Sequence, residues 1–398
     1  MINNINDLML HDVSSVDETI DVQALNKKID ATNKAETELK KADNAITAIG
    51  AKPADAETLA MIANHQKQVV MTMAGGNPED AIAILLAQGI ESYSKQLEII
   101  KGWTTPGLPM FESAMAVMFE GIKNGGETSG YALEDLFQLA IMDFMSHGYG
   151  EGKPGYSGNN GFEAQMRHFL ESTGSGSHGY HESYNGSRFA SECENIYKFM
   201  MDNSPQDSLC HEILTYMDDK CGGVSSLKSQ YINNYDDAGG FVCDSGYSGD
   251  LSPMLRMALM AGYLAIEPKV EQSVIDMFLT APISELDKYI NENTANPHYD
   301  SAIDFVFDND GQTGSDGWRE VTQNDSSGNS HQVIDWYGNG LGAKYFEDMY
   351  TNFPQRELTD EDIKEINRIG DQVKMLQQTL KYWLSICRDE QMAIARNI

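Results

Sequence analysis

Residues 359–398 read TDEDIKEINRIGDQVKMLQQTLKYWLSICRDEQMAIARNI, and this stretch decides the expected fold. Thr359 is a helix-capping residue type, acidic residues follow it, and no proline interrupts the run to Ile398. Apolar side chains recur at intervals of three and four, which predicts one amphipathic helix of about 39 residues, roughly 58 Å long. Such a helix is rarely stable alone in water, so it needs a partner stripe. The expected seam positions are Ile366, Ile369, Val373, Leu376, Leu380, Trp383, Cys387 and Ile394.

The first hundred residues supply a partner for this helix. Apolar or small residues recur at three-four spacing from Val22 to Ile49, which is typical of a coiled-coil seam. A second helix is expected from Leu59 to Met73, and Asn77-Pro78 begins a third that runs from about Ala81 to Lys101. We therefore expect the helices at the two ends of the chain to pair as a coiled coil.

Between these ends the composition changes, because glycines cluster from about Thr104 to Pro354. Long loops are expected there, separated by islands of helical periodicity, and the best strand candidates are Phe241–Cys243 and Gln332–Trp336. The sequence predicts a mainly α fold in which the paired terminal helices flank a large, irregular, mostly helical inserted domain. The expected parts are a flexible export segment at 1–21, helices at 22–103, the inserted domain at 104–354, and the C-terminal helix at 355–398. The expected helical islands are Phe111–Lys123, Leu133–Met145, Phe162–Leu170, Glu192–Met201, Leu209–Asp218, Met254–Ile266 and Val270–Leu279.

The charge of the chain excludes several classes of partner. Sixty acidic and 28 basic residues give a formal charge of −32. Such a chain repels phosphate backbones and anionic lipids, so nucleic acid is not an expected partner. The same charge opposes self-association unless apolar contacts, salt or lower pH offset it. No apolar run approaches the roughly 20 residues that span a bilayer, so no transmembrane segment is expected.

The N-terminus and the cysteines bear on where the protein is made. The opening residues lack the basic, apolar and small-residue regions of a cleavable signal peptide. The five cysteines are odd in number and irregularly spaced, so neither a complete disulfide framework nor a CxxC zinc site is indicated. Synthesis in the reducing cytoplasm, without a cleavable signal peptide, fits these observations best.

An acidic segment from Asp304 to Asp316 spaces oxygen ligands around a glycine, as hard Ca²⁺ requires. Asp308, Asp310 and Asp316 are weak calcium candidates. The terminal glutamate of an EF-hand loop is missing, so a solvated acidic turn is the preferred interpretation.

No catalytic motif is evident in the sequence. His147, His168, His178 and His181 lie in one glycine-rich stretch, and surface loop histidines are preferred over a zinc site. No G-x-S-x-G elbow appears, and no pair of carboxylates is singled out by spacing. We expect no enzyme activity and no cofactor, and we expect the many methionines to fill the core.

The terminal helices resemble those of a known family. The stretch from Ile369 to Leu384, continuing to Met392-Ala-Ile-Ala-Arg-Asn-Ile398, is similar to the C-terminal helix of type III secretion translocator-filament subunits, or of the related needle-tip proteins. In that family the N- and C-terminal helices pair as a coiled coil, stack into a hollow tube and display the intervening segment outside. An uncleaved N-terminus rich in Asn, Ser, Ile and Asp is also similar in kind to that of type III export substrates.

This resemblance implies a secreted, self-assembling filament or tip subunit of a cell-surface appendage. The implied partners are other copies of the chain, a secretion chaperone and a host surface. Two alternatives remain. One is a stalked secreted binding protein or effector that does not polymerise, and the other is an enzyme that uses the glycine-rich loops as its site.

Overall fold

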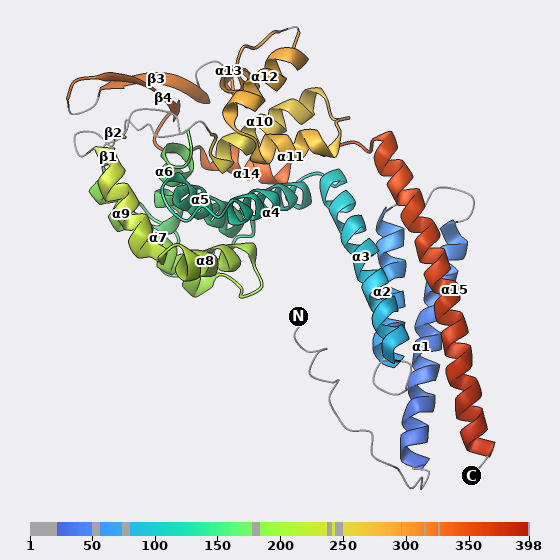
Figure 1. The fold of residues 1–398 in the computed structure, drawn as a ribbon. Helices are drawn as coiled ribbons and strands as arrows, with labels where there is room; N and C mark the ends of the chain where they lie inside the picture. Colours follow the sequence, from blue (N-terminus) through green and yellow to red (C-terminus); the bar gives the residue numbers. More distant parts are fainter. Residues whose placement is uncertain are drawn as a thin grey trace. The chain divides into compact units, whose positions relative to one another are not determined.

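A computed structural model describes residues 22–49, 56–73, 80–176, 184–236, 241–242, 250–295, 297–313, 316–324 and 327–396. Within these ranges the chain is mainly α, with 15 helices and two antiparallel hairpins (Figure 1). The contacts divide it into two compact units. The helices within residues 1–98 and 363–398 form the terminal unit, and residues 99–362 form the middle unit.

Four helices build the terminal unit. They are α1 (Val22–Ile49), α2 (Ala56–Met73), most of α3 (Asp80–Thr104) and most of α15 (Asp360–Arg396). Helices α1 and α15 contact each other and run antiparallel, because Gln377 donates to the Leu39 carbonyl (3.0 Å) and Gln391, further along α15, donates to the Lys28 carbonyl (3.2 Å). The expected contact between the N- and C-terminal helices is therefore present.

The start of α15 is capped as the sequence predicts. The Thr359 hydroxyl accepts the Asp362 N–H (3.3 Å), and the Asp362 carboxylate accepts the Thr359 N–H (2.8 Å). Arg356, which is buried, donates to both oxygens of Asp362 (2.6 and 3.0 Å). Burial raises the pKa of Asp362, but the hydrogen bonds from Arg356 and Thr359 outweigh it and hold the pKa below its usual range. These bonds fix where the helix begins.

The middle unit is built around α5 (Tyr131–Ser146), of which 14 of 16 residues are buried. A helix covered on all sides must lie in the interior of its domain. Its N- and C-terminal turns therefore bring polar side chains, including Glu134, Asp135 and Asp143, into the core. The other helices are α4 (Leu108–Gly125), α6 (Phe162–Ser172), α7 (Gly186–Asn203), α8 (Leu209–Lys220), α9 (Gly223–Asn234), α10 (Pro253–Ile266), α11 (Gln272–Thr280), α12 (Ile283–Asn293), α13 (Ala302–Asn309) and α14 (Ala343–Thr351).

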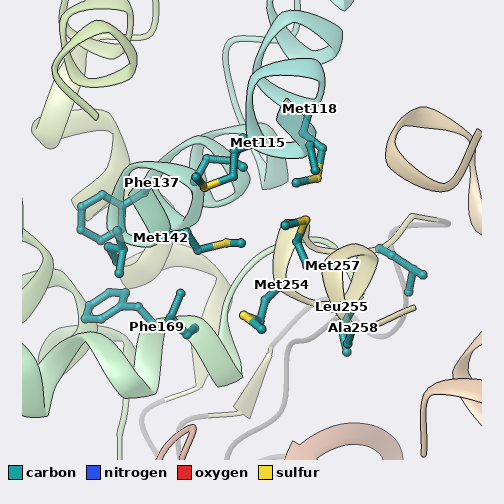
Figure 2. Close-up of a cluster of buried hydrophobic side chains, with 14 of the residues drawn as sticks. Met115, Met118, Phe137, Met142, Phe169, Met254, Leu255, Met257 and Ala258 are labelled. Carbon is teal, nitrogen blue, oxygen red and sulfur yellow. The ribbon is translucent and has the colours of Figure 1, made fainter. Parts of the chain in front are cut away.

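Methionines fill much of this core, as the sequence predicts. In Figure 2, side chains from α4, α5 and α10 meet in a cluster together with Phe137 and Phe169. The flexible, polarizable methionine side chain fills irregular gaps between helices well. The labelled methionines are Met115, Met118, Met142, Met254 and Met257, all buried.

Two short hairpins accompany the helices of the middle unit. Strand β3 (Trp318–Asn324) pairs with β4 (Ser330–Trp336) in antiparallel register, with Trp318 opposite Trp336. The two indole rings pack edge to face at 5.4 Å. The second hairpin pairs β1 (Tyr235–Asp236) with β2 (Phe241–Val242). The expected strand at Gln332–Trp336 is thus part of β4, whereas Cys243 lies outside the described residues.

Several sequence expectations for the middle unit are wrong. Residues 304–309 are helical, as part of α13, and do not form a loop. Ser301 caps this helix by accepting the Asp304 N–H (3.0 Å). Helices α9, α12 and α14 lie outside the expected helical islands, although α12 carries apolar residues at helical spacing, at Ile283, Leu286 and Ile290.

Candidate assembly helices

The predicted seam of α15 lies mostly inside the terminal unit. Six of the eight positions are buried, Leu376 is half-buried, and Ile394 is 36% exposed. The buried positions therefore pack against helices of the same chain and do not face solvent. They are Ile366, Ile369, Val373, Leu380, Trp383 and Cys387.

Ile394, near the end of α15, is the most exposed of the eight expected seam positions. The buried stripe of α15 keeps a heptad repeat. One series is Ile366, Val373, Leu380 and Cys387, and the other is Gly370, Gln377, Leu384 and Gln391. The second series contains two glutamines, which an apolar pattern does not indicate.

Gln377 is the centre of a buried polar network. Its amide nitrogen donates to the Leu39 carbonyl and to the Asp43 carboxylate, both at 3.0 Å. Its oxygen accepts from Gln66 of α2 (2.9 Å), and Gln66 also donates to the Val373 carbonyl (3.0 Å). The network thus joins α1, α2 and α15. A buried polar network that is fully satisfied fixes the register of helices, because any slip leaves polar groups without partners.

Two further groups extend this polar layer. The hydroxyl of Tyr93, from α3, donates to the side-chain oxygen of Gln66. Burial raises the pKa of Tyr93, so its hydroxyl stays protonated and remains a donor. Beyond Gln377 on α15, Gln391 donates to the Thr32 hydroxyl (2.7 Å). That hydroxyl in turn donates to the Lys28 carbonyl (2.9 Å). The two glutamines occupy the same heptad position, since 377 and 391 are 14 residues apart with Leu384 midway between them.

The outer surface of the terminal unit carries a second, exposed set of apolar side chains. On α15, Met375 and Tyr382 are 63% and 69% exposed and lie two turns apart. Of the thirteen exposed large hydrophobic residues in the described part of the chain, eight belong to this unit, although it contains only about a third of the sequence. The eight are Met61, Met71, Leu85, Ile363, Met375, Tyr382, Met392 and Ile394.

The negative charge is distributed very unevenly between the two units. Residues 99–362 contain 41 acidic and 14 basic side chains, a formal charge of −27. Residues 1–98 and 363–398 contain 19 acidic and 14 basic side chains, a formal charge of −5. The terminal unit is therefore nearly neutral and, among the described residues, presents most of the exposed large apolar side chains, whereas the middle unit is strongly acidic.

The weak calcium candidates have structural surroundings that differ from those expected. Asp310 is buried at the end of α13, where its carboxylate accepts the N–H groups of Gln312 and Trp318, each at 2.8 Å. Asp308 and Asp316 are exposed. Across the residues with described positions, no group of three or more His, Cys, Asp or Glu side chains is arranged to hold a metal ion.

The histidine stretch is also different from the expected surface loops. His168 is buried in α6 and stacks on Tyr184 with ring centroids 4.0 Å apart. His147 follows α5, where its ring contacts the Asp143 carbonyl (2.9 Å) and the Glu112 carboxylate (2.7 Å). The carboxylates of Asp143 (3.3 Å from the ring) and Glu112 raise the pKa of His147 to about 10, against the opposing effect of burial. His178 and His181 lie outside the described residues.

Comparison with known proteins adds nothing to this description. No protein-family model, curated protein or solved structure matches the chain. None of the helices in the described ranges is both long and apolar enough to cross a bilayer.

Proposed function

We propose that this protein is a self-assembling subunit of an extracellular filament, or of its tip, on a secretion apparatus. Its subunits contact one another through the outer faces of the terminal helices. The observation that carries the proposal is the combination of exposed apolar side chains and low charge on the terminal unit. Residues 99–362 lie outside the subunit contacts and are displayed on the assembled surface.

In this proposal the buried seam stabilises each chain, and the exposed residues form the contact between copies. Residues such as Leu380 and Val373 hold α15 against α1 and α2 within one chain. In the assembled form α1 and α15 pair as a coiled coil, and Met375 and Tyr382 remain on the outside of that pair, available to a second copy. A repeated, unclosed contact of this kind extends into a filament.

The charge distribution supports this division. Like charges repel over about 8 to 10 Å at physiological ionic strength, so a strongly acidic surface opposes close contact between copies. The terminal unit, at a formal charge of −5, avoids most of that cost, whereas the middle unit, at −27, discourages contacts through its own surface. Assembly through the terminal unit is therefore favoured over assembly through the middle unit.

The remaining parts of the proposal follow from the resemblance of the terminal helices. The protein is made in the cytoplasm, held by a secretion chaperone and exported without a cleavable signal peptide. It acts without enzyme activity or cofactor, and its middle unit meets a host surface. The alternative is a stalked secreted binding protein or effector that uses the same helices but does not polymerise.

Sedimentation velocity on the full-length chain tests the proposal. The double variant Met375→Lys with Tyr382→Lys places two charges on the proposed contact face, and it should shift the protein from assemblies to monomer. Ile232→Lys is the matched control, because Ile232 is an exposed apolar residue (55%) of the middle unit. It should assemble as the wild type does. If the double variant and the control sediment alike, the outer face of α15 is not the contact surface.

A further inference from the structure

The middle unit contains a pocket that assembly does not use. It has a volume of about 210 Å³ and lies between α4, the first turn of α5, the segment before α10 and the end of α11. One part of its wall is apolar and the other carries charged side chains. The apolar lining consists of Met118, Ile122, Leu251, Pro253 and Leu279, and the polar lining consists of Glu127, Asp135, Asp250, Arg256 and Thr280.

Arg256 does not offer its charge to a ligand. Its guanidinium donates to the carbonyls of Leu251 (3.0 Å), Phe278 (2.8 Å) and Ala281 (2.7 Å), and it also pairs with the Asp250 carboxylate. Four of its five N–H donors are therefore engaged within the protein. The group ties three segments of the pocket wall together, and its positive charge is offset by Asp250.

The acidic side chains remain as the groups that face a ligand. Asp135 is 93% buried, and its two oxygens accept the Ser175 N–H (2.8 Å) and hydroxyl (2.6 Å). An ionised carboxylate has about four acceptor sites, so Asp135 keeps capacity for a further donor. Glu127 is exposed. With Asp250 and Arg256 offsetting each other, the pocket has a net negative charge within a unit of formal charge −27.

One glycine of α4 leaves space in this pocket. Gly125 is a lining residue, and a Cβ built on it would meet no atom within 4 Å. At Gly121, one turn earlier, a Cβ would lie 3.2 Å from the Thr280 methyl group. A side chain can therefore be added at the exposed position 125, on the pocket lining, without displacing the protein, whereas one at position 121 disturbs the packing of α11.

We propose that this pocket binds an aliphatic ammonium group, with Asp135 receiving the charge and the apolar wall formed by Met118, Ile122 and Leu279 covering the carbon chain. A lysine side chain has this chemistry, and so does a free aliphatic diamine. Ligand pockets generally combine an apolar lining with a few polar groups that orient the ligand. The unit's large negative charge raises the local concentration of cations around the mouth.

Binding depends on pH through Asp135. Burial raises the pKa of this carboxyl to about 7, against the hydrogen bonds from Ser175 that lower it, and the nearby Asp250 and Glu134 add to the increase. Arg256, from α10, is the cation on the same wall. Because the ionised form attracts an ammonium group, affinity should rise as pH increases through about 7.

The test uses the full-length chain with methionine methyl groups labelled for NMR. N-acetyl-lysine methylamide should shift the Met118 methyl resonance in a saturable way, and cadaverine should do the same if a free diamine is accepted. N-acetyl-norleucine methylamide, which keeps the carbon chain but lacks the charge, should bind about tenfold more weakly or not at all. Saturation by cadaverine but not by the lysine probe would assign the site to free amines, and the reverse would assign it to a peptide side chain.

Variants complete the test. Gly125→Leu should abolish binding, and Gly125→Ala should retain it. Asp135→Asn should weaken binding about tenfold or more and remove its pH dependence, with the circular dichroism spectrum confirming that each variant folds. The proposal is overturned if neither cationic probe shifts Met118, if the norleucine probe binds as tightly as the lysine probe, or if Gly125→Leu leaves binding unchanged.

Discussion

The substitution Tyr93→Phe removes one hydroxyl from the polar layer of the terminal unit and changes nothing else in the side chain. That hydroxyl donates to the side-chain oxygen of Gln66, which is fully buried. The nitrogen of Gln66 is already engaged with Val373 and Gln377. A buried acceptor left without its donor costs about 1–3 kcal/mol. This corresponds to an increase of about 5- to 150-fold in the equilibrium constant for opening the unit.

Hydrogen exchange measured by mass spectrometry shows which helices lose protection when this hydrogen bond is removed. Protection of the backbone amides of α2 and α15 should fall by about 5- to 150-fold, while that of α5 in the middle unit stays constant. Tyr382→Phe is the matched control, since its side chain is 69% exposed, and it should change nothing. Equal protection in Tyr93→Phe and wild type, or an equal loss in α2 and α5, would refute the role given to this network.

Three other predictions concern separate parts of the molecule. Leu380→Ala should destabilise the terminal unit by about 3–5 kcal/mol in denaturant unfolding, because Leu380 is fully buried. Met375 is exposed, so Met375→Ala should change the free energy of unfolding by no more than about 0.5 kcal/mol. The raised pKa of His147 predicts a stabilising contribution that is complete below about pH 6.5 and is lost as pH rises through about 10. The difference in melting temperature between wild type and His147→Gln should therefore vanish near the upper end of that range. Asp310→Ala should lower the stability of the middle unit, because the buried Trp318 N–H and the half-buried Gln312 N–H lose their acceptor. Calorimetry of the wild type should show no calcium binding in the micromolar range or tighter.

The terminal helices were predictable because their signals are local. A capping threonine, an unbroken apolar period and a proline-free stretch locate α15 within a residue or two of its observed start. The polar layer was not predictable in the same way. Gln377 and Gln391 are hydrophilic residues that an apolar pattern does not mark as buried, and only the packed structure supplies acceptors for them.

The middle unit shows the limit of such reasoning more clearly. The segment from Asp304 to Asp310 combines acids with a following glycine, which is typical of a loop, yet Ser301 caps a helix there and Phe305 anchors it in the core. Asp135 is buried with the rest of α5, and its hydrogen-bond donors come from a distant segment, at Ser175. No local pattern indicates a contact across 40 residues of chain. The sequence therefore does not predict the pocket around Asp135.

Electron microscopy of negatively stained, full-length protein tests the central claim most directly. The measurement compares low salt at neutral pH with about 1 M salt, where the Debye length falls to about 3 Å, and with pH values approaching the isoelectric point near 4.4. If the terminal helices assemble the chain, regular fibres or rings should appear and become more abundant as the repulsion between acidic middle units is screened or titrated away. Monodisperse particles of single-chain size under every condition would contradict the proposal and leave the stalked binding protein in its place.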